Sequence, residues 1–264
     1  MDIDYLHVSA FTRTPGKGNP AAVVELNAWP SDEALSRIAR AIALPVTACL
    51  VRGDAGLELR WLSRAGSFVQ SMCGHGTLAA SLAVVLPDPS LTVFSFKTPG
   101  GPVPVRRDGE MFHLALPRWD CTPIGPWSEI SSALGAAPRE LLDAGRDILA
   151  VFDSEAEVRA LSPDMRRLLA LGRRGFIATA AGRQFDCVSR FFCPSFGLGV
   201  DEDPVTGSAH CSIAPLWSRR LGKTRIRAFQ ASPAGGELIC EVAADTVTIG
   251  APAALLARVR VSVP

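Results

Sequence analysis

Two segments, each with small residues leading into a long apolar run, limit the possible folds of this chain more than any other part of it. The first is CGHGTLAASLAVVL at 73–86, and the second lies in DEDPVTGSAHCSIAPLW at 201–217 and beyond. Each run is long enough for a helix and is apolar on all sides, and Pro87 ends the first. A helix without a polar face belongs inside a protein. The sequence therefore predicts two buried helices, at about 74–86 and 205–221.

Short strands separated by turn residues surround both segments. In the first half, strands are predicted at 4–11, 18–26, 47–51, 57–63, 91–98, 101–109 and 110–117. In the second half, they are predicted at 147–154, 176–182, 185–194, 237–251 (a hairpin) and 257–263. Further helices are predicted at 31–44, 138–145 and 163–171, the first with Ser31 as its N-cap. The same order thus occurs twice: strands, a helix, more strands, and then an apolar helix that begins with small residues.

This repetition predicts an α+β fold of two pseudo-symmetric lobes, each an antiparallel sheet wrapped around a central buried helix. We expect lobes at 1–117 and 118–264, with the final strand a candidate to return to the first lobe. A chain of 264 residues, 48% of them hydrophobic, can bury the cores of two such lobes.

Composition excludes several classes of partner and location. A formal net charge of +1 provides no electrostatic footprint for nucleic acid, and no apolar segment is long enough to cross a membrane. The first residues lack the basic and then apolar order of a signal peptide. Seven scattered cysteines without a CxxC pair indicate a reducing compartment, where most of them pack in the core. We therefore expect a cytoplasmic protein.

The chain also lacks the patterns expected for a metal or a nucleotide cofactor. Cys73, His75, His210 and Cys211 could be considered as zinc ligands. His210 and Cys211, however, are neighbours on a helix and point about 100° apart, so they are expected to pack at the helix start instead. No glycine-rich fingerprint precedes a phosphate-binding lysine. No metal and no cofactor are predicted.

The beginnings of the two buried helices are the predicted binding elements. A helix start has backbone N–H groups without partners and about half a positive charge, so it attracts carboxylates. Gly74 and Gly76 at the first start, and Gly207, Ser208 and Ala209 at the second, let a ligand approach the backbone closely. In two related lobes these starts are expected to face each other and hold one small anionic molecule. The alternative is that the glycines only permit tight turns.

Several segments resemble the family of the phenazine-biosynthesis isomerase PhzF. They are GNPAAVV at 18–24, CGHGTLAA at 73–80, DEDPVTGSAHCSIAPLW at 201–217, 149–168 and 230–238. The resemblance implies the diaminopimelate epimerase fold. It also implies proton transfer without a cofactor on a small, unsaturated amino or keto acid, and a homodimer, since members of the family are often dimers.

The sequence departs from the family at three places. The family's catalytic glutamate is replaced by Val46, and the expected Arg-Gly-Gly is altered to Ala234, Gly235 and Gly236. The second cysteine of the related epimerases falls at Pro204, which argues against a symmetric two-thiol racemase.

Without the glutamate, the acid and base candidates are Cys73, Asp203 and His75. Cys73 precedes a helix start, where a thiolate is stabilised, and the epimerases of the same fold use a cysteine at this position. The alternatives are that Cys73 only packs, that His75 makes a structural hydrogen bond, and that Asp203 caps the second helix. Ser208, with the backbone at Gly207 and Ala209, is expected to bind the substrate carboxylate. Gly74, Gly76, Thr77 and Asn19 complete the predicted substrate site.

The sequence thus predicts an isomerase that shifts a double bond by proton transfer in a small anionic acid, in natural-product, antibiotic-type biosynthesis. One alternative is a catalytically impaired protein of the same fold that binds a small carboxylate. The other is an amino-acid epimerase.

Overall fold

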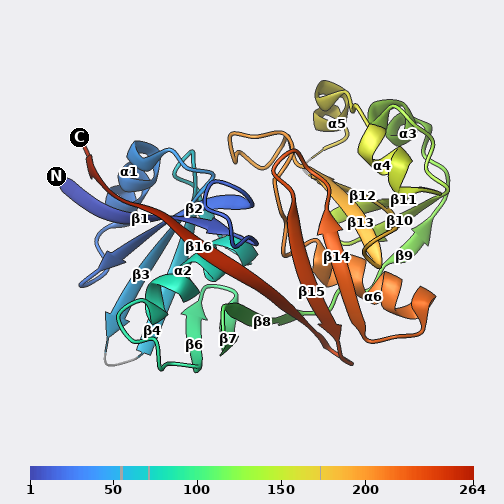
Figure 1. The fold of residues 1–264 in the computed structure, drawn as a ribbon. Helices are drawn as coiled ribbons and strands as arrows, with labels where there is room; N and C mark the ends of the chain where they lie inside the picture. Colours follow the sequence, from blue (N-terminus) through green and yellow to red (C-terminus); the bar gives the residue numbers. More distant parts are fainter. Residues whose placement is uncertain (54–55, 71, 173) are drawn as a thin grey trace. The chain divides into compact units, whose positions relative to one another are not determined.

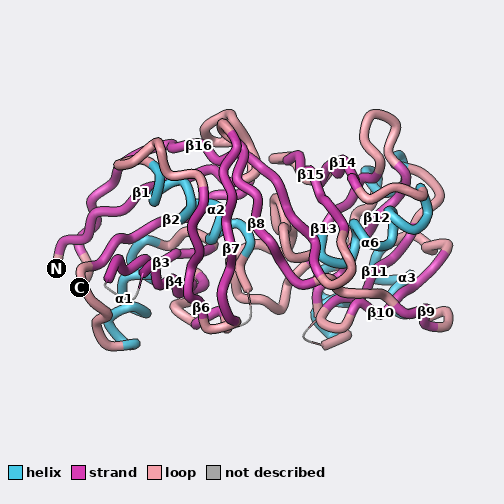
Figure 2. Tube along the Cα trace, turned by 90° about the horizontal axis from the view of Figure 1, so that it is seen from below, coloured by secondary structure: helices cyan, strands magenta, loops and turns pink. Residues whose placement is uncertain are grey.

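Two buried helices, α2 (Gly74–Val85) and α6 (His210–Leu221), organise two compact units of the chain (Figure 1). The computed structural model describes residues 1–53, 56–70, 72–172 and 174–264. The first unit comprises Met1–Ala115, Gly197–Gly199 and Gly250–Pro264, and the second comprises Leu116–Phe196 and Val200–Ile249. Strand dominates in both units, and the helices are few and mostly short (Figure 2).

The first unit is built on strands that follow one another across a sheet in the order β1, β2, β3, β4, β6, β7, β8, with β5 beside β4. Their bounds are β1 (Asp2–Ala10), β2 (Asn19–Leu26), β3 (Val46–Gly53), β4 (Gly56–Ser63), β5 (Phe68–Val69), β6 (Val93–Thr98), β7 (Gly101–Asp108) and β8 (Met111–Pro117). Helix α2 packs on β1, β2 and β3, and all but one of its residues are buried. It is buried because it offers no polar side that could face water.

Helix α1 (Asp32–Ile42) covers the first unit elsewhere and is amphipathic. Its apolar side contributes Leu35 and Ile38 to a cluster that includes Cys49 and Leu62 of β3 and β4. Ser31 is its N-cap, as the sequence predicted, and accepts a hydrogen bond from the Ala34 N–H. The helix ends at a left-handed residue, Ala43.

The second unit has its own run of strands, in the order β9, β10, β11, β12, β13, β14, β15. Their bounds are β9 (Thr122–Ile124), β10 (Glu140–Ala144), β11 (Asp147–Val151), β12 (Gly175–Ala181), β13 (Cys187–Phe192), β14 (Arg225–Gln230) and β15 (Gly236–Val242). Helix α6 packs on β14 and β15. The short helices α3 (Ser128–Leu134), α4 (Glu155–Ala160) and α5 (Met165–Ala170) cover another apolar cluster.

Most neighbouring strands pair antiparallel, as predicted, but the sheets are mixed, so the prediction of an antiparallel sheet in each lobe needs correction. In the first unit β2 pairs with β3 and β4 with β6 in parallel, and in the second β11 pairs with β12 and β13 with β14. A helix lies in the chain between the two strands of every one of these pairs. A helical crossover returns the chain to the starting end of the preceding strand, and this makes the pair parallel. The two buried helices are themselves such crossovers.

The helix predicted at 138–145 is wrong. Residues Glu140–Ala144 form β10, which pairs antiparallel with β11 through the two-residue turn at Gly145 and Arg146. Gly145 has a positive φ of 72°, and its N–H bonds the Asp143 side chain. Gly145 therefore serves a tight hairpin turn. The helix of this region is α3, which ends at the left-handed Gly135.

The second buried helix also begins later than the predicted residue 205. Residues 207–209 form a tighter turn, in which the N–H groups of His210, Cys211 and Ser212 bond the carbonyls three residues earlier. Regular α-helix starts at His210. Bonds to the third residue are common where a helix begins, and they extend the helical backbone to the small residues that the sequence singled out.

The last part of the chain is one long strand, β16 (Thr246–Ser262), where the sequence indicated a hairpin arm and a separate strand. Residues 253–262 pair with β1, from Ala10 opposite Ala253 to Asp2 opposite Ser262, with one irregularity beside His7. This pairing gives most of the second half of β16 a hydrogen-bonded partner strand. The Gly250–Pro264 segment belongs to the first unit. Among the helices that the structure describes, none has the length and apolar character needed to cross a bilayer.

Gly175→Ala is expected to destabilise the second unit. A methyl group at Gly175 would lie 2.5 Å from the Phe191 ring and closer still to the Asp147 carboxylate, and both neighbours are buried. Overpacking of this kind costs about 1–3 kcal/mol. Urea denaturation should show a correspondingly lower free energy of unfolding.

Gly125→Ala is the matched control, because nothing lies within 4 Å of the added methyl and the backbone is not left-handed there. It should leave stability unchanged or raise it by up to about 1 kcal/mol. Equal unfolding free energies for the two variants would contradict the packing described for Gly175.

Candidate functional site

Cys73 stands at the start of α2 as its N-cap residue, with an extended backbone and no side-chain capping bond. Its carbonyl accepts hydrogen bonds from the Thr77 N–H at 3.0 Å and from the Thr77 hydroxyl at 2.8 Å. The Thr77 side chain is thus bonded to the helix itself. The first N–H groups of α2, from Gly74 on, have no partner within the helix, as at any helix start.

His75 lies beside the Cys73 thiol. The Cys73 Sγ and the His75 Nδ1 are 3.7 Å apart, and each residue is only 7% exposed. This pair joins two of the three predicted acid and base candidates within the first unit. A thiol and an imidazole in contact can exchange a proton, because imidazole titrates near neutral pH.

Val46 lies near the Cys73 thiol at the start of α2. A Cβ built on Gly76 would lie 3.1 Å from both the Cys73 Sγ and the Val46 Cγ1, and 2.8 Å from the Trp61 ring. Gly76 is therefore required for this close packing. Val46 is buried, so the position at which the sequence analysis placed the missing glutamate is filled by an apolar side chain near the thiol. Within the described chain, the buried indole N–H of Trp61 has no acceptor.

Asn19, the other predicted substrate contact of the first unit, begins β2 and is fully buried. It pairs with Ala10 of β1 and follows Gly18, whose φ is 67°. A Cβ on Gly18 would overlap the Ala10 carbonyl, so the Gly-Asn-Pro turn needs glycine there.

In the second unit, Asp203 lies in a buried network of side chains. The Thr206 hydroxyl donates to its carboxylate, and the Gln230 amide donates to its carbonyl at 2.7 Å. Gln230 also accepts from the Thr206 N–H at 2.7 Å. Asp203 is 3% exposed. It is not the cap of α6, because the N-cap of that helix is Ala209, which makes no side-chain capping bond.

The start of α6 provides unpaired donors. Within the described part of the chain, the N–H groups of Gly207, Ser208 and Ala209 have no hydrogen-bond acceptor. All three residues are buried, and α6 is twelve residues long. Such a start can bind a carboxylate through its N–H groups and its partial positive charge.

Sequence reasoning missed the charged pair next to this helix start. The Arg146 guanidinium makes two bonds to the Asp147 carboxylate, of 3.0 and 2.7 Å, and its Nη2 donates to the Ser208 hydroxyl at 3.1 Å. Thr206 and Gln230 were missed as well. A hairpin turn 62 residues before Ser208 carries no local signal of this contact, since the chain brings the two together only through its fold.

The remaining cysteines are buried and unsuited to proton transfer. All seven cysteines are free and buried, as the composition predicted for most of them. Burial raises the pKa of the Cys49 and Cys211 thiols to about 12 and that of Cys121 to about 11. It also raises the pKa values of Cys187, Cys193 and Cys240. These six stay protonated at neutral pH, which leaves Cys73 as the candidate thiol.

His210 has a packing role. It is fully buried, and its Nδ1 lies 2.8 Å from the Thr206 carbonyl. The carbonyl must accept from an Nδ1–H, and burial lowers the pKa of His210 to about 4. The residue is thus neutral at pH 7. Among the described residues, no three His, Cys, Asp or Glu side chains lie close enough together to hold a metal ion.

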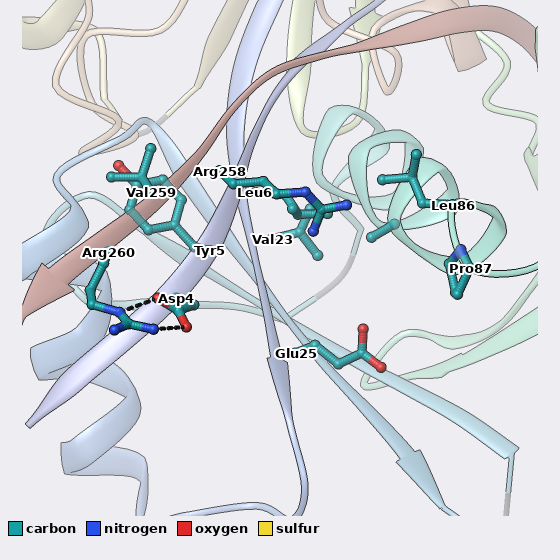
Figure 3. Close-up of a pocket in the computed structure, with 11 residues that line it drawn as sticks. Asp4, Tyr5, Leu6, Val23, Glu25, Leu86, Pro87, Arg258, Val259 and Arg260 are labelled. Carbon is teal, nitrogen blue, oxygen red and sulfur yellow. Dashed lines mark hydrogen bonds and ion pairs between the residues drawn. The ribbon is translucent and has the colours of Figure 1, made fainter.

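A cavity of about 770 Å³ in the first unit lies apart from all of these residues (Figure 3). It is lined by β1, β2, β16 and the end of α2, including Leu6, Val23 and Leu86. Its Asp4 and Arg260 form a two-bond ion pair of 2.6 and 2.7 Å. None of the predicted site residues borders this cavity.

Comparison with known proteins identifies the fold of the chain. A probable proline racemase from Agrobacterium radiobacter superposes with a TM-score of 0.67 at 12% identity, covering 99% of this chain and 93% of that one. The chain therefore shares the sheet-rich fold of that protein, which is consistent with the diaminopimelate epimerase fold that the sequence indicated.

The particular family follows from nearer relatives. A family model described as phenazine biosynthesis-like protein matches residues 8–257. An uncharacterized isomerase of Pseudomonas aeruginosa is 41% identical over 266 residues, covering 99% of this chain and 100% of the relative. A PhzF-family phenazine biosynthesis protein from Enterococcus faecalis has a TM-score of 0.91 at 36% identity, covering 98% and 99% of the two chains. The chain belongs to the phenazine biosynthesis-like family.

The buried neutral His210 should make stability fall with acid. An unfolded histidine takes up a proton near pH 6.5, whereas folded His210 does so only near pH 4. Lowering the pH between these values therefore favours the unfolded chain, by about 3 kcal/mol in all. Unfolding free energies measured at pH 7 and pH 4.5 should show most of this loss.

In His210→Asn, whose amide can still donate to Thr206, the loss between pH 7 and pH 4.5 should be smaller by about 2–3 kcal/mol. His7→Asn is the comparison variant. Burial lowers the pKa of His7 as well, but this side chain is only partly buried, so its replacement should change the pH dependence less than His210→Asn does. A pH dependence that is the same in His210→Asn as in the unchanged chain would show that His210 is not the group responsible.

Proposed function

We propose that this chain is an isomerase that moves a proton between carbons of a small unsaturated amino or keto acid, and so shifts a double bond. No cofactor takes part in the proposed reaction. The observation that supports the proposal is that a side chain able to carry a proton lies at or just before the start of each buried helix. In the first unit this group is Cys73 in contact with His75, and in the second it is Asp203. The isomerases among the relatives support the proposal.

In the proposed step, one group removes a proton from a C–H bond, and the electron pair left behind becomes part of a new double bond. The old double bond then takes up a proton at its far carbon, so the substrate is neither oxidised nor reduced. The N–H groups of Gly207, Ser208 and Ala209 bind the carboxylate of the substrate and stabilise the negative charge that develops next to it. Asp203 or Cys73 acts as the base. That both helix starts contact one ligand remains a prediction from the sequence.

A second candidate function is binding of a small carboxylate without turnover. It is favoured by one observation, the buried valine at the position of the family glutamate. A positioned base contributes about 10²–10⁴ in rate, so a chain without a substitute would retain the anion site and lose most of its activity. The biosynthetic setting, the cytoplasmic location and the homodimer inferred from the sequence also remain predictions.

Cys73→Ser and Asp203→Asn should each lower proton exchange by about 10²-fold or more, since each removes a group that transfers protons and preserves its size. The measurement is deuterium incorporation from D₂O into a panel of small unsaturated amino and keto acids, followed by mass spectrometry. Cys121→Ser is the matched control, because its thiol is buried and protonated. Undiminished exchange in both test variants would contradict the assigned roles, and no exchange in the unchanged chain would favour the binding protein.

Val46→Glu should raise the exchange rate by about 10²-fold or more, because it places a carboxylate beside Cys73 where the family has its base. The unpartnered Trp61 N–H is a nearby donor for it. Val46→Gln is the control, since it has nearly the same shape but cannot take up a proton. Equal rates for the two variants would show that the valine is not what limits this chain.

A further inference from the structure

Arg146 is fixed near the start of α6 by an ion pair with a buried partner. Its partner Asp147 is only 1% exposed, and the two bonds between them fix the plane of the guanidinium. A buried carboxylate must be paired, so Asp147 holds Arg146 in one orientation. The Nη2 bond to Ser208 then joins this group to the helix start that the proposed function uses.

The surrounding backbone is built to allow this pair. Asp147 lies opposite Gly175 in the parallel β11–β12 ladder, and a side chain at Gly175 would collide with both Asp147 and Phe191. The turn that carries Arg146 is fixed by Arg174, whose Nη2 bonds Asp143 at 2.6 Å and the Gly145 carbonyl at 2.8 Å.

Aromatic rings surround the guanidinium. Its central carbon lies 5.5 Å from the ring centres of Trp119 and Phe196 and 5.9 Å from that of Phe191. Phe191 is buried, whereas Trp119 and Phe196 are partly exposed. Rings at this distance stabilise a cation and leave apolar faces next to it.

One edge of Arg146 is still available. Among the described residues, its Nη1 has no hydrogen-bond acceptor, and 31% of the side chain is exposed. This edge lies next to Ser208, where the N–H groups of residues 207–209 also have no acceptor. A positive charge, a hydroxyl and several free N–H groups therefore occur together beside two accessible aromatic rings.

We propose that Arg146 is a specificity-determining residue that binds the substrate carboxylate through Nη1, together with Ser208 and the start of α6, and that Trp119 and Phe196 select planar, unsaturated acids. This inference rests on the proposed function and narrows its substrate class. A purely structural Arg146 would only neutralise Asp147. When the charge of Asp147 is removed, a structural Arg146 has no further role, and its loss should not change ligand affinity. An Arg146 that binds the substrate carboxylate should still increase that affinity.

Two variants of the intact chain separate these roles. Asp147→Asn removes the buried negative charge and keeps the cation, while the double variant Arg146→Gln/Asp147→Asn removes both charges and leaves no unpaired ion in the interior. The probes are pyrrole-2-carboxylate and its uncharged amide, pyrrole-2-carboxamide. Binding is measured by calorimetry and by the fluorescence change that is lost in Trp119→Phe.

Asp147→Asn should bind the carboxylate within about threefold of the unchanged chain. The double variant should bind it at least about tenfold more weakly and lose the preference for the acid over the amide, because a charge-assisted hydrogen bond is gone. If Asp147→Asn does not fold, Arg146→Lys replaces it as the variant that keeps the charge. Equal carboxylate affinity with and without the cation would overturn the proposal, as would failure of the unchanged chain to bind the carboxylate.

The outcomes also separate this inference from the proposed isomerase. Carboxylate binding that depends on Arg146, in a chain that exchanges no proton, supports the role of Arg146 and contradicts the isomerase. Proton exchange that continues in the double variant with an unchanged KM overturns the role of Arg146 and leaves the isomerase standing.

Discussion

The structure depends on burying two helices, α2 and α6, that have no polar side along the buried part of their length. α2 and the first two turns of α6 consist almost wholly of buried residues, and water cannot be their neighbour. Each helix connects two parallel strands of its own unit. A crossover of this kind packs the helix against the sheet, which removes it from water. A consequence is that the two helix starts, with their unpaired N–H groups, lie at buried positions where little water competes for them.

The polar groups at these starts are placed by contacts that are distant in sequence. Asp203 is held by Thr206 and by Gln230 of β14, and Ser208 by Arg146 from the β10–β11 hairpin. In such surroundings electrostatic interactions are stronger than in water, and an unpaired charge is costly. The pairing of Arg146 with Asp147 meets this cost and leaves one guanidinium edge for another anion.

Val46, at the position where the sequence analysis placed the family glutamate, has apolar and buried surroundings. Val46 is buried beside Gly76, which also borders Cys73 and Trp61, and the Trp61 indole N–H has no acceptor in the described chain. In the proposed function, Cys73 and Asp203 take over the proton transfer.

The sequence by itself determined the two buried helices, the Ser31 cap, most of the strands and the family, because these follow from local periodicity, turn residues and contiguous motifs. It did not determine the parallel pairs, the β10 hairpin or the unbroken β16, since strand direction and length depend on which distant strand becomes the partner. Cys73, His75, Asp203 and Ser208 could be named from their motifs. Arg146, Thr206 and Gln230 could not, because only the tertiary structure brings a hairpin turn and the end of β14 to the start of α6. Hydrogen bonds between residues far apart in the chain leave no pattern that a linear sequence can show.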